Sequence, residues 1–204
     1  MSRPVRFTPT SKDGLFSAMW LDEPRELKSA GFTALLKSLQ TEAATVGWLH
    51  TNLPEPLTGS LTPDIDASAA TVAVLAGHGD NAGGALKLRD GWWSGPDVPM
   101  PSLRLAVLLA CFGGRIRPQA PLDLGGLVVR FLASGVRSVV APKWPVEGTS
   151  GAAFVESLVS RVIAEPDVRQ PHQTARLVHA TLNEAFGNET GAARAAAALF
   201  SCFA

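Results

Sequence analysis

Two short apolar runs, each ending in a reactive side chain, constrain the fold of this chain more than any other feature. They span residues 71–79 (TVAVLAGHG) and 105–114 (LAVLLACFGG). An apolar run of about six residues bounded by glycines is typical of a strand buried on both faces, and such strands occur in parallel sheets covered by helices. We therefore predict an α/β fold with a mostly parallel central sheet flanked by helices.

The two runs end in an imidazole and a thiol. In parallel sheets, ligands bind outside the carboxyl ends of the strands, because the chain turns over there and side chains point into an open crevice. If the two strands are parallel neighbours, His78 and Cys111 meet at one edge of the sheet. Glycines on both sides of His78 and two residues after Cys111 allow a substrate backbone to approach. Together these features predict a cysteine nucleophile site.

Composition narrows the class of protein. The 204 residues are enough for one domain with a substantial core, and the 18 basic residues balance the 18 acidic residues, so no overall field attracts nucleic acid or acidic lipid. Residues 1–6 are polar, unlike a signal peptide, and the longest apolar run is far shorter than a membrane span. Cys111 and Cys202 are the only cysteines, too few for a disulfide framework. We expect a cytoplasmic protein that binds neither nucleic acid nor membranes.

The N-terminal half shows fewer clear elements. Residues 5–7 and 15–20 are predicted to be edge strands joined by an Asp-Gly turn. Acidic residues and a proline at 22–24 favour a helix start, and apolar side chains within Phe32–Leu39 share one helical face. Residues 50–70 carry three prolines and are predicted to be a long connection, either an insertion or a regulatory loop.

The C-terminal half alternates strands and helices. Residues 85–93 are predicted to be a small hairpin, and residues 113–121 an exposed, basic, proline-rich segment. A helix with apolar residues from Leu124 to Phe131 ends at Gly135, and the strand 136–141 follows it. This order gives a right-handed crossover, so the loop 142–147 emerges at the edge that holds Cys111. Three further helices are predicted over residues 150–163, 172–186 and 190–199.

With these elements in place, the sequence resembles the CHAT domain family, which comprises caspase-like modules of the clan that contains caspases and separases. The resemblance runs from about Thr71 to Phe186. It implies a three-layer caspase-like fold, with residues 71–204 as the peptidase core. Residues 1–70 carry no such resemblance, and we expect them to form an N-terminal segment of the same domain. Four motifs in order carry the resemblance: AGHG (76–79), ACFGG (110–114), GGLVVRFLASGVRSVVA (125–141) and WPVE (144–147).

Two positions depart from the family pattern. Leu109 stands where the family usually has a serine, and it lies within a strand, away from the chemistry. Glu147-Gly148 stands where an aspartate pair is usual, so the substrate preference of the family does not carry over directly.

The resemblance implies a role for each residue at the edge. Cys111 is the nucleophile, His78 is the acid and base, and the backbone N–H groups of Gly79 and Cys111 form the oxyanion hole. Reasoning from chemistry gives the same roles: sulfur attacks the amide carbon, the leaving amine receives a proton, and the negative oxygen needs preorganised donors. The chemistry needs no metal and no cofactor.

We therefore predict a cysteine endopeptidase that cleaves a protein substrate and is controlled by a separate activator or sensor protein. The alternative is an inert module of the same fold that acts by binding a partner. The predicted substrate pocket contains Trp144, Glu147, Trp92 and Trp93. Glu147 either selects arginine or lysine before the scissile bond or begins the next helix. Arg115 and Arg117 are candidate autoprocessing positions.

Further patterns lack the context that their chemistry needs. Residues 77–82 match the dinucleotide pattern G-x-G-x-x-A, but no helical apolar face follows them. His172 and His179 share a helix face without a third metal ligand. His50 is predicted to lie in a loop. Trp20 and Trp48 are predicted to lie in the core, and Cys202 is predicted to be buried or frayed near the terminus.

Overall fold

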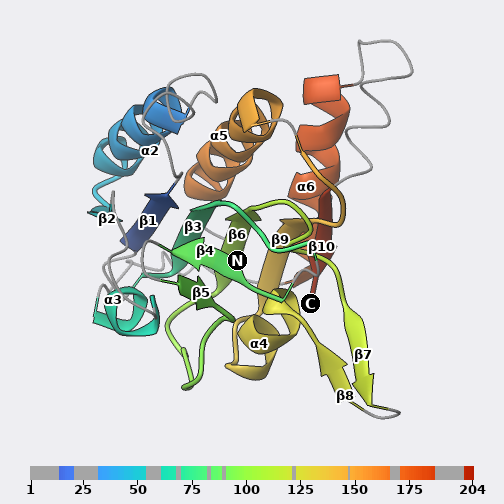
Figure 1. Cartoon of the computed structure of the whole chain (residues 1–204). Helices are drawn as coiled ribbons and strands as arrows, with labels where there is room; N and C mark the ends of the chain where they lie inside the picture. The colour runs from blue at the N-terminus through green and yellow to red at the C-terminus, as the bar shows by residue number, and fades with distance from the viewer. Residues whose placement is uncertain are drawn as a thin grey trace, which may run out of the picture.

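A six-stranded sheet forms the centre of the computed structural model (Figure 1), whose strand order is β10-β9-β6-β3-β1-β2. Every neighbouring pair is parallel except β9 and β10. The strands are β1 (Gly14–Trp20), β2 (Leu49–Leu53), β3 (Val72–Gly77), β6 (Leu105–Leu109), β9 (Ser138–Pro142) and β10 (Phe200–Phe203). The structure describes residues 14–20, 32–53, 61–67, 70–81, 84–88, 91–120, 123–146, 148–165, 171–186 and 200–204.

Helices cover both faces of the sheet and give the molecule three layers (Figure 1). One face packs against α2 (Phe32–Thr45), α5 (Gly148–Ala164) and α6 (Pro171–Phe186). The other face packs against α3 (Thr62–Ala67) and α4 (Leu127–Ala133), together with a hairpin of β4 (Leu86–Leu88) and β5 (Gly91–Trp93). The predicted three-layer caspase-like α/β architecture is confirmed.

The strands β3 and β6 are apolar throughout because their side chains contribute to both layers. In β3, Val72, Val74 and Ala76 pack into the core on the α5 face, whereas Ala73 and Leu75 pack into the core on the α4 face. The residues of β6 alternate in the same way. A fully buried valine or leucine side chain contributes about 1.5–3 kcal/mol relative to an exposed one. The two strands that carry the predicted site residues are therefore stabilised by apolar burial on both faces of the sheet.

The connections around these strands differ from a simple helical crossover. The chain passes from β3 to β6 through the β4–β5 hairpin, which the sequence predicts. It passes from β6 to β9 through a second hairpin, of β7 (Arg117–Ala120) and β8 (Asp123–Gly125), and then through α4. The predicted stop at Gly135 is present: its φ of 93° closes the last turn of α4, and its N–H donates to the Leu132 carbonyl.

Four sequence predictions need correction. The strand at residues 15–20 is not an edge strand, because β1 lies between β3 and β2. The region 50–70 is not one long connection, because it contains most of β2, which places His50 in a strand, and all of α3. The helix predicted from Leu124 begins at Leu127, because Leu124 pairs with Pro118 in the β7–β8 hairpin. The segment 113–121 is not exposed throughout, because Gly113 and Gly114 are buried, whereas Arg115 and Ile116 are exposed.

The predicted strand at residues 5–7, the helix start at 22–24 and the helix at 190–199 lie outside the described residues. Helices predicted at 150–163 and 172–186 are present as α5 and α6. No helix in the described part of the chain is long and apolar enough to cross a lipid bilayer.

Candidate active site

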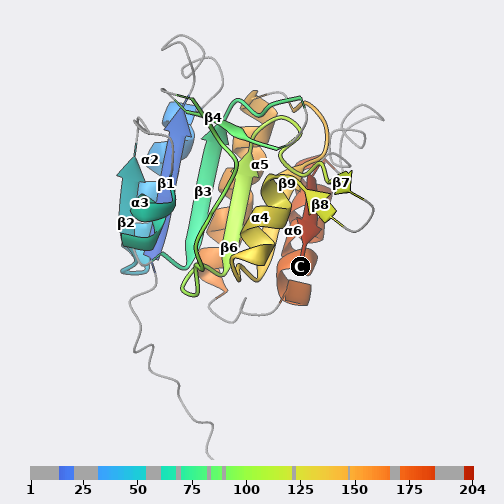
Figure 2. The ribbon, with the colours of Figure 1, turned by 60° about the horizontal axis from the view of Figure 1, so that its bottom comes forward.

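The carboxyl ends of β3 and β6 bring the histidine and cysteine segments together. The strands are parallel neighbours, and their register pairs Ala76 with Leu109. Continuing this register by two residues brings His78 level with Cys111. The carboxyl ends of β3 and β6 point to the end of the sheet that β4 crosses (Figure 2). The edge predicted to hold the site is thus formed by the two strands expected from the sequence.

Gly79 is in direct backbone contact with Cys111. A Cβ atom added to Gly79 would lie 2.0 Å from the Cys111 carbonyl oxygen and 3.4 Å from the Ala110 Cβ. No side chain larger than hydrogen fits there, because real Cβ atoms do not approach another heavy atom so closely. The glycine is therefore required for the two segments to meet. Its small size serves contact within the protein, in addition to the substrate approach predicted from the sequence.

The β4 strand holds the histidine segment. The Lys87 N–H donates to the His78 carbonyl at 2.7 Å, and the Asp80 N–H donates to the Ala85 carbonyl at 3.1 Å. The carboxylate of Asp80 also accepts hydrogen bonds from the backbone N–H groups of Gly84, at 2.7 Å, and Ala85, at 3.2 Å. These four bonds hold the backbone on both sides of Gly79.

The same pattern fixes the direction of the Gly79 N–H. Gly79 and Leu86 form an antiparallel bridge, and its two hydrogen bonds come from the flanking residues. Gly79 therefore occupies a non-hydrogen-bonded pair, in which its own N–H points away from the partner strand. Its N–H is directed away from β4.

The cysteine lies in a tight turn just past the end of β6. Cys111 is half-buried and its thiol is free. Phe112 has a φ of 59°, the one non-glycine residue with positive φ among the described residues, and this conformation costs of order 1 kcal/mol unless its surroundings stabilise it. The Gly113 N–H donates to the Ala110 carbonyl at 2.9 Å, and the Gly114 N–H donates to the Pro142 carbonyl at 2.8 Å. Backbone bonds thus hold this turn against the end of β9.

The predicted pocket residues differ in exposure. Trp92 is 52% exposed and pairs across β4–β5 with Lys87, whose ammonium lies 5.4 Å from the Trp92 ring centroid. Trp144 is 59% exposed and lies two residues beyond Pro142. By contrast, Trp93 is 3% exposed and packs edge-on against Phe131, so it is a core residue and does not line an open surface. Glu147 lies outside the described residues.

Arg115 and Arg117 separate in the structure. The Arg115 side chain is exposed and donates from Nη1 to the Asn81 carbonyl at 2.9 Å. Arg117 is the first residue of β7 and pairs with Gly125. No sequence pattern indicates the contact between Arg115 and Asn81, because the two residues lie 34 positions apart.

A second polar cluster lies between β1 and β2, and the sequence analysis missed it. The fully buried Ser17 hydroxyl lies 2.9 Å from Nε2 of His50 and donates to Oδ1 of Asn52 at 3.2 Å. With its proton on Asn52, the hydroxyl accepts from Nε2–H of a neutral imidazole. Burial lowers the pKa of His50 below its ordinary value of 6.5. The run of three polar residues in LHTNL is the only signal of this cluster in the sequence.

Two rival site types find no support in the geometry. After Gly79 the chain enters the β4–β5 hairpin, whereas a dinucleotide fingerprint requires a helix to open there. His179 is exposed on α6, and the side chain of His172 is outside the described set. Within the described ranges, no three His, Cys, Asp or Glu residues are grouped as a metal site would require.

Comparison with known proteins agrees with the fold and with the resemblance seen in the sequence. The model of the CHAT domain family matches residues 30–185. No curated protein matches the chain in sequence.

Solved structures of similar fold include a separase and a caspase. The separase–securin complex of Saccharomyces cerevisiae gives a TM-score of 0.58 at 14% identity, over 95% of this chain and 12% of that chain. Caspase-1 from Spodoptera frugiperda gives a TM-score of 0.57 at 16% identity, over 95% of this chain and 86% of that chain. The chain thus spans only a small part of the separase, and at these identities both structures establish the fold alone.

Proposed function

The chain belongs to the CHAT domain family, and on that premise we propose that it is a cysteine endopeptidase that uses Cys111 and His78. The observation that carries the proposal is the contact between the Gly79 and Cys111 backbones at the carboxyl ends of two parallel strands. This contact brings together the segments that bear a thiol and an imidazole, at the edge where α/β sheets bind ligands.

The first half of the reaction forms a thioester. The Cys111 sulfur, as thiolate, attacks the carbonyl carbon of the scissile peptide, and the electron pair of the carbonyl moves to its oxygen. When the tetrahedral intermediate collapses, the C–N bond breaks and the protonated imidazole of His78 gives its proton to the leaving amine. The N-terminal part of the substrate is then attached to sulfur.

The second half releases the product. Neutral His78 takes a proton from a water molecule while the oxygen of that water attacks the thioester carbon. The C–S bond then breaks, which returns Cys111 as the thiolate and leaves His78 as the imidazolium. In the tetrahedral intermediate of each half, the substrate oxygen carries negative charge that needs fixed donors. We propose that the N–H groups of Gly79 and Cys111 supply them, supported by the direction of the Gly79 N–H away from β4.

Two exposed tryptophans support a peptide-binding role for this edge. Trp92 belongs to the hairpin that holds His78, and Trp144 follows the strand that holds the Cys111 turn. We propose that these indole rings contact the substrate on the two sides of the scissile bond, and that Glu147 selects arginine or lysine before that bond. Trp93, being buried, is left out of the pocket.

We also propose that a separate protein controls the activity. The separase of similar fold was crystallised in complex with securin, so a fold of this kind is compatible with a protein partner. Arg115 and Arg117 remain candidates for self-cleavage. In this structure the Arg115 side chain is bound to the Asn81 carbonyl, so cleavage after Arg115 would require that bond to open.

A library of fluorogenic peptides tests the function. We expect the wild type to cleave peptides with a basic residue before the scissile bond, Cys111→Ala to lose at least about 10³-fold in rate, and Cys202→Ala to cleave normally. Glu147→Gln should weaken the basic preference. Equal cleavage by wild type and Cys111→Ala would refute the assignment, and rapid partner binding without any cleavage would favour the inert module.

A further inference from the structure

Arg115 links the two segments that form the site. We define the Cys111 loop as residues 110–115 and the His78 loop as residues 78–81. Arg115 belongs to the first by its backbone, where its N–H donates to the Phe112 carbonyl at 2.9 Å. Its Nη1 donates to the carbonyl of Asn81, at the end of the second, at 2.9 Å. One side chain therefore joins both loops.

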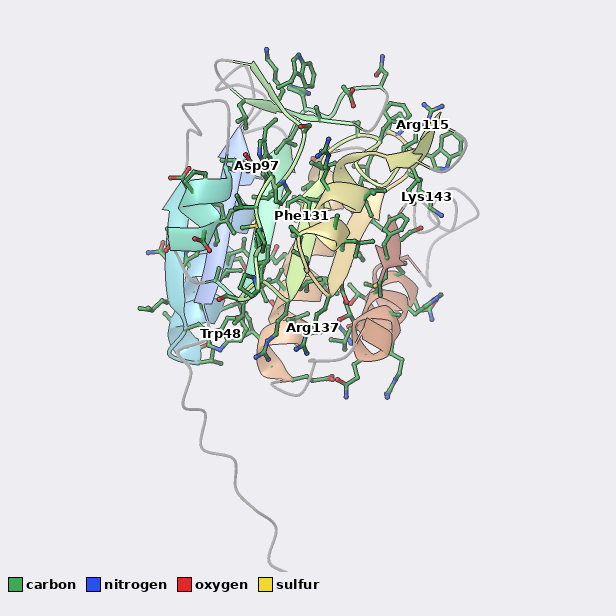
Figure 3. All side chains as sticks on the ribbon, turned by 90° about the horizontal axis from the view of Figure 1, so that it is seen from below. Trp48, Asp97, Arg115, Phe131, Arg137 and Lys143 are labelled. Atoms are coloured by element: carbon green, nitrogen blue, oxygen red, sulfur yellow. The ribbon has the colours of Figure 1, made fainter. Side chains whose placement is uncertain are left out.

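The Arg115 guanidinium also lies over the ring of Phe112. Its central carbon is 5.9 Å from the ring centroid, within the range of a cation–π contact. Phe112 directly follows Cys111 and has the left-handed φ of 59°. Arg115 thus contacts the residue with the unusual backbone conformation as well as the opposite loop. Figure 3 shows Arg115 at the end of the molecule opposite Trp48 and Arg137, which precede β2 and β9.

The contact at Gly79 makes the spacing of the two loops sensitive to small shifts. With the site for a Cβ on Gly79 only 2.0 Å from the Cys111 carbonyl oxygen, the two backbones are already as close as they can be. The loops can therefore move apart, whereas they cannot move together. A link that prevents separation is what keeps the nucleophile and the acid/base in register.

We propose that Arg115 is a positioning residue that holds the Cys111 loop and the His78 loop at the separation needed for peptide cleavage; this rests on the peptidase function proposed above. Arginine suits the task because its planar guanidinium donates to a carbonyl and lies over an aromatic ring at the same time. Arg115 does not touch the reacting atoms.

The test compares three variants. Arg115→Met keeps the length of the side chain and removes the donors and the charge. Arg115→Lys keeps the charge but presents it as a point charge without the planar fork. Arg176→Met is the matched control, because Arg176 is an exposed arginine on α6. Thermal unfolding of all three variants checks that each one folds as the wild type does.

Kinetics separate positioning from substrate binding. We expect Arg115→Met to lower kcat by about 10- to 100-fold with KM changed by less than about threefold, because small displacements of a reacting group are costly while the bound substrate is untouched. Arg115→Lys should recover part of the loss, and Arg176→Met should behave as wild type. Unchanged kcat in Arg115→Met would overturn the proposal. A raised KM with normal kcat would also overturn it and would place Arg115 against the substrate.

A second measurement does not depend on cleavage. The rate at which iodoacetamide alkylates Cys111 is followed by mass spectrometry, with Cys202 as the internal reference. We expect Arg115→Met to slow alkylation of Cys111 by at least about threefold, because thiol reactivity depends on its neighbouring groups, with Cys202 unchanged. If the wild type shows no cleavage that depends on Cys111, the peptidase proposal fails. The alkylation rates of Cys111 then decide by themselves whether Arg115 positions the Cys111 loop. Equal alkylation rates in wild type and Arg115→Met overturn that role.

Discussion

Two histidines of this chain lie beside a segment that carries a hydroxyl or thiol residue, and we propose that only one of them, His78, acts in catalysis. His50 is in the middle of β2, with Ser17 on the neighbouring β1. His78 follows the end of β3, and Cys111 follows the end of the neighbouring β6. Judged by distance alone, the pair of Ser17 and His50, at 2.9 Å, has the appearance of a nucleophile and its base.

Position along the strand makes the difference. Ser17 is 0% exposed, because a residue inside a strand of a covered sheet is enclosed by the layer that packs on it. Its hydroxyl binds His50 and Asn52, so its hydrogen-bonding capacity is used within the protein. Cys111 lies two residues beyond its strand and is half-buried, so it is less enclosed than Ser17. Similar side chains therefore serve stability within the sheet and, in the function that we propose, chemistry at its end.

Replacing the two histidines gives the largest expected contrast. We expect His78→Ala to lose about 10³-fold in the rate of peptide cleavage, since a positioned general acid or base contributes about 10²–10⁴-fold. His50→Ala should retain the cleavage rate of the wild type, because its ring faces Ser17 on the other side of β3 from β6. The measurement is kcat/KM for both variants on one peptide substrate. Comparable losses in both variants would remove the distinction between the two clusters.

Two glycines near the site give the next contrast. In Gly79→Ala the new methyl group would lie 2.0 Å from the Cys111 carbonyl oxygen, so the backbone must shift. We expect a loss of about 10²-fold in cleavage rate, the effect of displacing a reacting group by about 1 Å. Overpacking of this kind also lowers the free energy of unfolding by about 1–3 kcal/mol.

Gly91→Ala is the matched control for this substitution. Gly91 is in β5, in the same hairpin region, and a Cβ added there has no heavy atom within 4 Å. We expect its free energy of unfolding to stay within about 0.5 kcal/mol of the wild type and its cleavage rate to be unchanged. Urea unfolding and peptide cleavage measure both quantities. Full activity in Gly79→Ala would mean that the close contact between the loops is dispensable.

The sequence predicts the central strands well because the apolar pattern that determines each strand lies within a few adjacent residues. All six residues of β3 are buried, and a run of valine, leucine and alanine that ends in glycine has few alternatives to a covered parallel strand. The turn at Gly135 and the β4–β5 hairpin likewise follow from residues that are adjacent in sequence. The edge that carries His78 and Cys111 is therefore predictable from the order of residues alone.

The outer elements depend on contacts that the sequence does not display. The edge strand β2 reads Leu-His-Thr-Asn-Leu, with neither an apolar run nor a β-branched pattern, and it forms because Ser17 and the backbone of β1 provide partners. The strand β10 has only four residues. The sequence prediction places Trp93 in the pocket because it is adjacent to Trp92. Successive side chains of a strand point to opposite faces, so Trp92 is exposed and Trp93 lies in the core.

The smallest expected effect is the pH dependence of stability that His50 causes. Burial lowers its pKa in the folded protein below the ordinary value of 6.5, so below about pH 6.5 the unfolded chain binds this proton more readily than the folded chain does. The stability associated with neutral His50 is therefore complete above pH 6.5 and decreases as the pH falls toward the lowered pKa.

His50→Gln removes the titration while keeping a donor for the Ser17 hydroxyl. We expect the free energy of urea unfolding to fall less steeply from pH 7 to pH 5 in His50→Gln than in the wild type, with the two curves parallel above pH 7. The titratable groups that both proteins share contribute equally to the two curves, so the difference between the curves reports the effect of His50. Parallel curves over the whole range would show that His50 titrates as an exposed histidine, and the contrast with His78 would then rest on position along the strand alone.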